Sequence, residues 1–334
     1  MRFEKNVSLK PYNSFRIQAQ AERLARFSSW EELSGLLQEL PDSPMVILGG
    51  GSNVLLRNDQ RAVLLNEVMG IEVIGEDERY VYVKAGAGET WHRFVEYCID
   101  RGWAGVENLS LIPGKVGAAP MQNIGAYGAE LKDVFQSLEA FHLKDRQMVT
   151  FSGEQCAFGY RESVFKNKFR GQFSIMNVTF RLNKVPSFNT SYGAIARELE
   201  VMGVKELSIR AISEAVIAIR TSKLPDPQKI GNAGSFFKNP EIPAAAYASL
   251  RQQFPEMIAY PVDGGCKLAA GWLIEQCGWK GFREGDAGVH AKQALVLVNY
   301  GNATGGQLYE LSERIVESVL EKFGVHLQRE VNIL

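Results

Sequence analysis

The sequence predicts an α+β fold built from more than one domain. Apolar and β-branched runs typical of strands recur along the chain together with amphipathic segments at helical spacing. The length of 334 residues corresponds to about two ordinary domains, or to one large domain with an insertion. A proline-containing stretch at residues 223–227 ends a predicted helix and has the composition of a linker, so a further unit is expected to begin there.

The first hundred residues predict helices and strands in alternation. Residues 29–32 have the form of a capping box, and apolar residues at helical spacing follow them. Residues 45–48 form an apolar run that stops at a glycine cluster, which indicates a buried strand followed by a tight turn. Residues 63–85 predict further strands, and Thr90 is placed to cap the next helix. The predicted inner face of that helix comprises Trp91, Phe94, Val95 and Cys98.

The remaining elements continue the mixed pattern. Strands are expected at 138–143, 148–151 and 173–182, with an irregular polar stretch at 158–168, and a helix carries Ile212, Val216 and Ile219. Beyond the linker we expect a helix at 272–277, a strand at 294–298, a helix from Thr304 to Gly324 and a strand-like tail at 325–334.

Charge and cysteine content exclude several classes of function. Lys and Arg total 37 and Asp and Glu total 38, so no net field would gather nucleic acid or an anionic membrane. The start lacks the apolar core of a signal peptide and no apolar run approaches a membrane span, so we expect a cytoplasmic enzyme or binding protein. The four cysteines are far apart and contain no C-x-x-C pair, which predicts buried free thiols and no metal site.

Glycine is over-represented, with 32 residues, and it gathers in clusters. The first cluster is Gly49, Gly50, Gly51, Ser52 and Asn53. It follows a predicted strand, so its amide groups could hold a phosphate without a lysine; a plain capped turn is the alternative. Neither G-x-G-x-x-G nor G-x-x-x-x-G-K-[ST] occurs, which disfavours a Rossmann fold and a P-loop.

Two further glycine clusters indicate a binding site. Residues 112–128 are almost all small or apolar, with Gln122 and Asn123 as their only side-chain amides, so this backbone could lie flat along a large ligand; a simple surface loop is the alternative. Residues 231–240 place Ser235 between a Gly-Asn-Ala-Gly turn and two aromatic residues, where its hydroxyl could donate a proton or merely cap the turn. The four histidines are isolated, so serine nucleophilic catalysis is weakly supported.

Two charged residues are candidates for catalysis. Arg161 lies in the irregular stretch between predicted strands, where a guanidinium could bind an anion or an enolate. Glu330 lies in the alternating tail, where burial in a cleft would raise its pKa and make it a proton donor. Solvated, outward-facing side chains are the alternative at both positions.

In this order, these segments resemble the UDP-N-acetylenolpyruvoylglucosamine reductase family of bacterial peptidoglycan precursor synthesis. The resemblance spans nearly the whole chain and rests on residues 13–15, 49–53, 112–128, 160–166, 220–227, 231–240 and 330–331. It implies a vanillyl-alcohol-oxidase-type FAD-binding fold of two subdomains plus a third, substrate-binding α+β domain. The implied boundaries are 1–70 and 71–222 for the FAD subdomains, with 325–334 returning to the second, and 223–324 for the substrate domain.

The resemblance also implies a chemistry and a set of site residues. The cofactor is non-covalent FAD, NADPH is the co-substrate, the substrate is a UDP-sugar enolpyruvyl ether, and we expect a monomer. Flavin N5 would deliver hydride and Ser235 a proton, while Arg161 and Glu330 match the pair that steadies the enolic intermediate. The residues that match substrate contacts are Tyr192, Lys223, Asn239 and Gln293. The residues that match cofactor contacts are Gly49, Gly50, Gly51, Ser52, Asn53, Ile112, Pro113, Gly114, Gly117, Ala118, Ala119, Gln122, Asn123, Gly125, Ala126, Tyr127 and Arg220.

Two alternatives and some departures accompany this resemblance. Another FAD oxidoreductase of the same fold would act on an alcohol or hydroxy acid, and a nucleotide-binding scaffold would keep the glycine loops without the chemistry.

Lys115 and the pair Ala118-Ala119 stand where relatives often carry small or hydroxyl residues. Asn332 stands where relatives commonly carry arginine.

Overall fold

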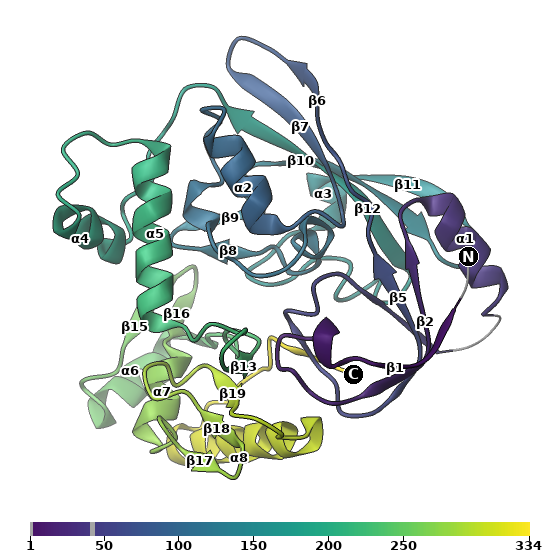
Figure 1. Ribbon diagram of the computed structural model, residues 1–334. Coiled ribbons are helices and arrows are strands. Elements are labelled where there is room, and N and C mark those ends of the chain that lie inside the picture. The colour runs from purple at the N-terminus through teal and green to yellow at the C-terminus, as the bar shows by residue number, and fades with distance from the viewer. Residues whose placement is uncertain (1–2, 41–43) are drawn as a thin grey trace. The chain divides into compact units, whose positions relative to one another are not determined.

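The computed structural model describes residues 3–40 and 44–334 and contains both helices and strands, which confirms the α+β class (Figure 1). The chain divides into two compact units. Unit 1 comprises Met1–Val7, Ala21–Gly50 and Gln60–Ser222, and unit 2 comprises Ser8–Gln20, Gly51–Asp59 and Lys223–Leu334. The second unit thus takes up the chain again at Lys223, beside the predicted linker, while the first glycine cluster is divided between the units after Gly50.

The two larger sheets in the described part of unit 1 have four and five strands. The four-stranded sheet has the order β1 (Glu4–Ser8), β2 (Gln20–Phe27), β5 (Gln60–Asn66) and β3 (Met45–Leu48), with β5 parallel to both β2 and β3. The five-stranded antiparallel sheet has the order β11 (Gln147–Ser152), β10 (Phe135–His142), β12 (Phe173–Asn183), β7 (Tyr80–Gly86) and β6 (Ile71–Glu76). The strands expected in these regions are therefore confirmed, and 158–168 is irregular as predicted.

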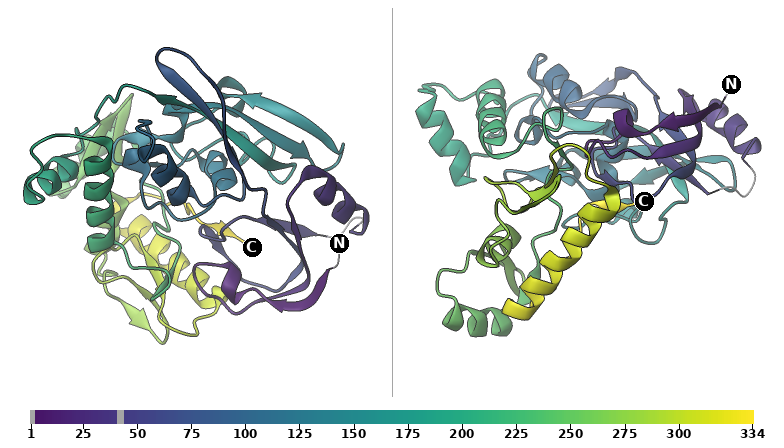
Figure 2. Two further views of the ribbon diagram at one scale, coloured as in Figure 1. Left: turned by 45° about the horizontal axis from the view of Figure 1, so that its top comes forward. Right: turned by 60° about the horizontal axis from the view of Figure 1, so that its bottom comes forward.

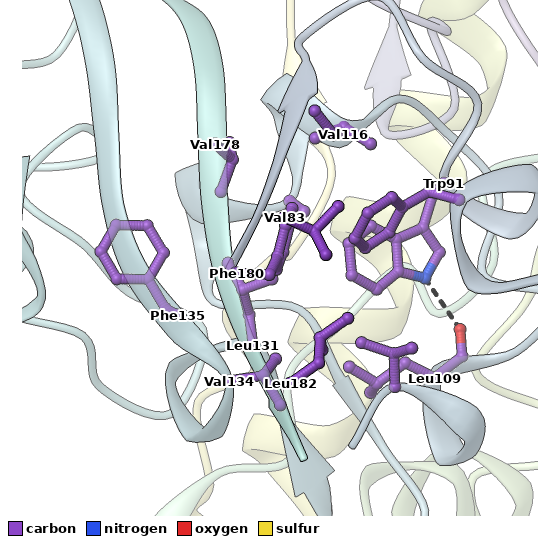
Figure 3. Close-up of a cluster of buried hydrophobic side chains, with 14 of the residues drawn as sticks. Val83, Trp91, Leu109, Val116, Leu131, Val134, Phe135, Val178, Phe180 and Leu182 are labelled. Atoms are coloured by element: carbon purple, nitrogen blue, oxygen red, sulfur yellow. Dashed lines mark hydrogen bonds between the residues drawn. The ribbon is translucent and has the colours of Figure 1, made fainter. Parts of the chain in front are cut away.

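Two predicted helices of unit 1, Trp91–Ile99 and Ile209–Lys223, bury the apolar residues that their periodicity predicts. The helices of unit 1 are α1 (Trp30–Gln38), α2 (Trp91–Ile99), α3 (Gly153–Cys156), α4 (Gly193–Val201) and α5 (Ile209–Lys223). All four residues of the predicted inner face of α2 are buried in a hydrophobic core that also includes residues of the five-stranded sheet. Figure 3 shows Trp91 beside Val83 and Phe180 there, with its indole N–H donating to the Leu109 carbonyl oxygen at 2.8 Å. Large aromatic side chains thus account for much of this core.

Unit 2 contains small sheets and the long helix α8. One sheet has the order β13 (Gly231–Asn232), β19 (Leu297–Asn299), β18 (Ala287–Val289) and β17 (Arg283–Glu284), and another has the order β14 (Glu241–Pro243), β16 (Gly265–Leu268) and β15 (Ala259–Val262). The helices are α6 (Ala244–Gln253), α7 (Ala270–Gln276) and α8 (Gly305–Phe323), and Figure 2 shows α8 as one straight rod. A reciprocal capping box between Thr304 and Gln307 begins α8, and Gly324 ends it at φ 66°.

Some local expectations differ from the structure. At α1, Ser29 accepts the Glu32 amide as a cap, but the Glu32 carboxylate accepts from Ser28 rather than from the cap residue. In the tail 325–334, only β20 (Asn332–Ile333) forms a strand, and it pairs in parallel with β4 (Val54–Leu55) of unit 2 rather than with a strand from 71–222. Pairing partners at such separations are set by packing, which no local pattern encodes.

The four cysteines of the described chain differ in their exposure to solvent. Cys98 and Cys156 are buried free thiols as predicted, and burial raises the pKa of Cys156 to about 12, whereas Cys266 and Cys277 are only half-buried. None of the helices in the described residues has the length and apolar character needed to cross a membrane. Across residues 3–40 and 44–334, no three His, Cys, Asp or Glu side chains are grouped to hold a metal ion.

Glu107 is a buried carboxyl group whose ionisation should lower stability. It is 3% exposed, and burial raises its pKa, although the Gly105 amide donates to Oε2 at 2.6 Å and opposes the rise. The contribution of the Glu107 carboxyl group to folding stability is therefore complete below its pKa in the unfolded state, about 4.3. It is lost as the pH rises through the pKa of the same group in the folded state. Glu107→Gln keeps an acceptor for Gly105 without a charge. We expect urea unfolding to show the variant gaining stability over the wild type towards about pH 8, with the gain vanishing near pH 4; a pH-independent difference would contradict this.

Candidate active site

The glycine segments of unit 1 touch backbone to backbone. Gly49 and Gly50 are exposed at the end of β3. A Cβ on Gly50 would lie 3.2 Å from the Gly114 Cα, and one on Gly49 would lie 3.2 Å from the Lys115 Cβ. Gly114 itself has φ 121°, a conformation that favours glycine. The first and second clusters thus lie against each other, with the Lys115 side chain packed beside Gly49, and a large ligand could approach the glycine backbone closely.

The second cluster is tightly turned rather than flat. It contains two 3₁₀ turns, Val116–Ala118 and Pro120–Gln122, followed by the hairpin of β8 (Gly125–Ala126) and β9 (Ala129–Glu130). A Cβ on Gly117 would lie only 2.4 Å from the Ala87 Cβ. Some of the small residues in this segment are therefore required for close packing inside unit 1. Ligand contact alone does not account for the composition of the segment.

Asn123 organises this segment from within. The residue is fully buried and has φ 43°. Its side-chain amide donates to the Gly159 carbonyl oxygen at 3.0 Å and to Glu130 Oε2 at 3.1 Å, and its Oδ1 accepts the Lys132 amide at 3.0 Å. The side chain predicted to contact a cofactor therefore links the glycine segment to the irregular stretch that carries Arg161.

The Arg161 guanidinium is held against the same segment. Its Nη2 donates to the Gly125 carbonyl oxygen at 2.6 Å, and its Nη1 lies 3.4 Å from the Asn123 carbonyl oxygen. The Arg161 backbone has φ 102°, which is strained for a residue with a side chain. Strain of this kind persists only where surrounding contacts impose it, and it is typical of functional positions.

Gly125→Ala should displace the Arg161 guanidinium and destabilise unit 1. A Cβ at Gly125 would lie 2.9 Å from Arg161 Nη1 and 3.0 Å from the Ala129 carbonyl oxygen. We expect urea unfolding to show a loss of about 1–3 kcal/mol, the usual cost of overpacking. The matched control is Gly193→Ala at the start of α4, where a Cβ meets nothing within 4 Å. Equal stability of the two variants would contradict the expectation.

Tyr127, Arg220 and Tyr192 form a second cluster in unit 1. Burial lowers the pKa of Arg220, and the neighbouring Tyr127, to which it is hydrogen-bonded, opposes that shift. Burial likewise raises the pKa of Tyr127, and the Arg220 charge opposes the rise. The Tyr127 and Tyr192 rings meet edge to face with centroids 5.4 Å apart. The structure thus brings two predicted cofactor residues together with a predicted substrate residue.

Two asparagines that the sequence reasoning missed tether the loop bearing Tyr192. Asn108 donates from Nδ2 to the carbonyl oxygens of Tyr127 and Asn189, each at 2.9 Å. Asn189 donates in turn to the Gly128 carbonyl oxygen at 2.9 Å. Asparagine is so common in loops that neither residue carries a distinctive sequence signal.

In unit 2, the Ser235 turn has a defined conformation. Asn232 Oδ1 accepts the Gly234 amide at 3.0 Å, and Gly234 has φ 70°. Ser235 itself is half-buried, and Phe236 and Phe237 after it are buried at 0% and 1% exposure. The two aromatic residues anchor the turn, and Ser235 lies beside them at the edge of the core.

Main-chain hydrogen bonds place the Glu330 segment beside this turn. The Glu330 amide donates to the Phe236 carbonyl oxygen at 2.8 Å, and the Lys238 amide donates to the Gln328 carbonyl oxygen at 2.9 Å. Residues 236–238 and 328–330 therefore run antiparallel, with Phe237 opposite Arg329. The structure thus joins the segments of two predicted catalytic residues, Ser235 and Glu330.

Asn53 and Asn332 complete this part of unit 2. Asn53 Nδ2 donates to the Glu330 carbonyl oxygen at 3.3 Å. Asn332 donates to the Asn53 carbonyl oxygen twice, from its backbone amide at 3.1 Å and from Nδ2 at 3.0 Å. Asn332 therefore supports the backbone of the first glycine cluster.

The predicted substrate residues of unit 2 fall into two places. Asn239 Oδ1 accepts the Ala270 amide at 3.0 Å, and Gln293 Oε1 lies 3.1 Å from where a Cβ of Gly271 would be. Both side chains thus lie near the start of α7. Lys223 is exposed at the end of α5.

The predicted site residues are divided between the two units. Unit 1 contains Gly49, Gly50, Ile112, Pro113, Gly114, Gly117, Ala118, Ala119, Gln122, Asn123, Gly125, Ala126, Tyr127, Arg161, Tyr192 and Arg220. Unit 2 contains Gly51, Ser52, Asn53, Lys223, Ser235, Asn239, Gln293 and Glu330. Among the catalytic candidates, Ser235 and Glu330 therefore share a unit, and Arg161 belongs to the other.

Comparison with known proteins finds two family models that match this chain. The sequence model of an FAD binding domain matches residues 21–152, and that of the UDP-N-acetylenolpyruvoylglucosamine reductase C-terminal domain matches residues 226–334. A UDP-N-acetylenolpyruvoylglucosamine reductase from Flavobacterium johnsoniae is 48% identical over 337 residues, covering 100% of both chains. One from Pseudomonas savastanoi pv. phaseolicola is 50% identical over 331 residues, covering 98% of this chain and 97% of its own.

A solved structure supports the same assignment. The crystal structure of UDP-N-acetylenolpyruvylglucosamine reductase from Thermus caldophilus matches with a TM-score of 0.70 and 26% identity, covering 100% of this chain and 99% of that one. The sequence similarity thus extends over whole chains, and the fold similarity does as well. This chain belongs to the UDP-N-acetylenolpyruvoylglucosamine reductase family.

Proposed function

We propose that the protein reduces UDP-N-acetylenolpyruvoylglucosamine to UDP-N-acetylmuramate, using NADPH and bound FAD, as a cytoplasmic monomer in peptidoglycan precursor synthesis. Family membership supports the reaction. The structural observation that carries it is the hydrogen bond from the Glu330 amide to the Phe236 carbonyl oxygen, which holds the Glu330 segment beside the Ser235 turn. A proton donor and an acidic partner in adjacent segments suit a reaction that adds hydride and a proton across a double bond.

The residues of unit 1 fit an FAD molecule. Gly49, Gly50 and Gly114 carry no side chains of their own, so a pyrophosphate could approach their main chain, with the Lys115 side chain packed beside Gly49. Arg220 adds a buried guanidinium beside Tyr127. We assign FAD binding to the glycine segments of residues 1–70 and 71–222 and substrate binding to residues 223–324, with Tyr192 joining the substrate side.

When bound, FAD supplies the hydride chemistry between NADPH and the enolpyruvyl group. Ser235 donates the proton that completes the product at the carbon next to the one that accepts hydride. The Arg161 guanidinium, oriented by the Gly125 carbonyl oxygen, binds the substrate carboxylate and stabilises charge that develops there. Glu330 shares a proton with the enolic oxygen, and Lys223, Asn239 and Gln293 bind the nucleotide part.

The first experiment is spectroscopic. The purified protein should be yellow, and its flavin absorbance should bleach when NADPH is added without oxygen and return when UDP-N-acetylenolpyruvoylglucosamine follows. A folded preparation that binds no flavin on reconstitution would contradict the proposal. A yellow protein that is reoxidised by neither this substrate nor a simple enolpyruvyl ether would favour another oxidoreductase of this fold, and one not reduced by NADPH at all would favour a nucleotide-binding scaffold.

A further inference from the structure

Leu111 occupies a strained position directly before the second glycine segment. It has φ 57°, a left-handed conformation that is costly for a branched side chain. The next residues, 112–128, are the ones that the proposed function assigns to FAD. The orientation of the Leu111 peptide groups therefore sets the direction in which this segment starts, and contacts that hold Leu111 also hold the segment.

Two side chains from different helices bind the main chain of Leu111 on both sides. The Leu111 amide donates to His92 Nδ1 at 3.0 Å, and Arg220 Nε donates to the Leu111 carbonyl oxygen at 3.2 Å. His92 lies on α2 and Arg220 on α5. The two contacts together satisfy the backbone donor and acceptor of a residue that lies outside any helix or strand.

The contact with His92 defines the protonation state of the imidazole. Nδ1 accepts a hydrogen bond only when it carries no proton, so the proton of the neutral ring lies on Nε2. Nε2 is 3.6 Å from Glu96 Oε1 on the same helix. Burial lowers the pKa of His92, the Glu96 charge raises it, and the Arg220 charge from α5 lowers it again. Near neutral pH the ring is therefore the acceptor that Leu111 requires.

We propose that His92 and Arg220 are positioning residues that hold the Leu111 peptide groups, and thereby the second glycine segment, in the conformation that binds FAD. The inference rests on the proposed function for its ligand. When His92 gains a proton at low pH, Nδ1 becomes a donor that faces the donor of Leu111, and the contact is lost. FAD affinity should therefore fall as pH decreases through the His92 pKa.

Variants of His92 separate this role from general stability. In His92→Asn, the side-chain oxygen stands near the place of Nδ1 and accepts without titrating, whereas His92→Phe removes the acceptor. The matched control is His142→Asn, because His142 Nδ1 also accepts a backbone amide, that of Asp145 at 3.2 Å, at the end of β10. FAD dissociation constants from flavin fluorescence quenching, measured between about pH 5 and 8, provide the first readout.

The expected results differ for each variant. Wild type and His142→Asn should lose about tenfold in FAD affinity towards low pH, the effect of one hydrogen bond. His92→Asn should keep near-neutral affinity throughout, and His92→Phe should be about tenfold weaker at all pH values. A pH dependence in His92→Asn equal to that of the wild type would overturn the proposal.

A second readout needs no flavin. Hydrogen exchange of the Leu111 amide in the apo protein should accelerate in His92→Phe and, for the wild type relative to His92→Asn, at low pH. Unchanged exchange in His92→Phe would overturn the proposal even if FAD binds. If no variant or wild-type protein binds FAD, the proposed function fails, while accelerated exchange in His92→Phe would still support the role of His92 in positioning Leu111.

Discussion

Ser235→Ala is expected to slow reoxidation of the reduced flavin by the enolpyruvyl substrate by about 10²–10⁴-fold, the usual contribution of a general acid. Flavin reduction by NADPH should keep nearly its wild-type rate, because only the second half-reaction needs the proton of Ser235. The turn should survive the change, since Asn232 and the buried Phe236 and Phe237 define it without the hydroxyl group. Anaerobic stopped-flow absorbance resolves the two half-reactions separately.

A second serine provides the matched control for this variant. Ser249 lies on α6, where its hydroxyl donates to the Ala245 carbonyl oxygen at 3.2 Å, and Ser249→Ala should leave both half-reactions unchanged. Equal slowing of both half-reactions in Ser235→Ala would assign Ser235 a structural role instead of proton donation.

Arg161→Lys should slow the same half-reaction by about 10²–10³-fold, the cost of losing one preorganised donor to a developing charge. The planar guanidinium binds carboxylates through a fork, and the Gly125 carbonyl oxygen orients it from behind. A lysine ammonium would keep the charge but lose the planar geometry. The rate of reoxidation at saturating substrate is the decisive measurement, since it isolates the chemical step from substrate affinity.

The control for Arg161→Lys is Arg170→Lys, just beyond the irregular stretch 158–168 in unit 1, at an exposed position. This variant should reoxidise at the wild-type rate. If Arg161→Lys also retains the wild-type rate at saturating substrate and shows only a higher KM, Arg161 binds substrate without stabilising the intermediate.

Elements with strong local signals could be predicted well. The strand at 45–48 has the predicted bounds, and α8 begins after Thr304 and ends before Gly324 as expected. Such signals are local, because a cap or an apolar period acts within a few residues. The helix α4 was not predicted, although Ile195 and Leu199 are buried at helical spacing, since a single pair of apolar residues is a weak signal.

For the candidate site, too, the sequence indicated some features and gave no signal for others. Residue types showed which segments carry chemistry, and the order of the glycine clusters indicated the family. His92, however, is not among the residues that periodicity predicts for the inner face of α2, and nothing in the sequence linked it to Leu111. The bonds of the Asn123 side chain to Glu130 and the Gly159 carbonyl oxygen were likewise not indicated by any local pattern.

The sequence by itself determined the kinds of elements, the segments without side chains and the residues able to donate protons or bind anions, because each depends on residue type and near neighbours. Only the tertiary structure decided which distant segments meet: β20 with β4, the Glu330 amide with the Phe236 carbonyl oxygen, and the Leu111 peptide with two helices. Those partnerships arise when the core closes and every buried backbone donor must find an acceptor, a condition imposed by the whole fold and absent from any local pattern.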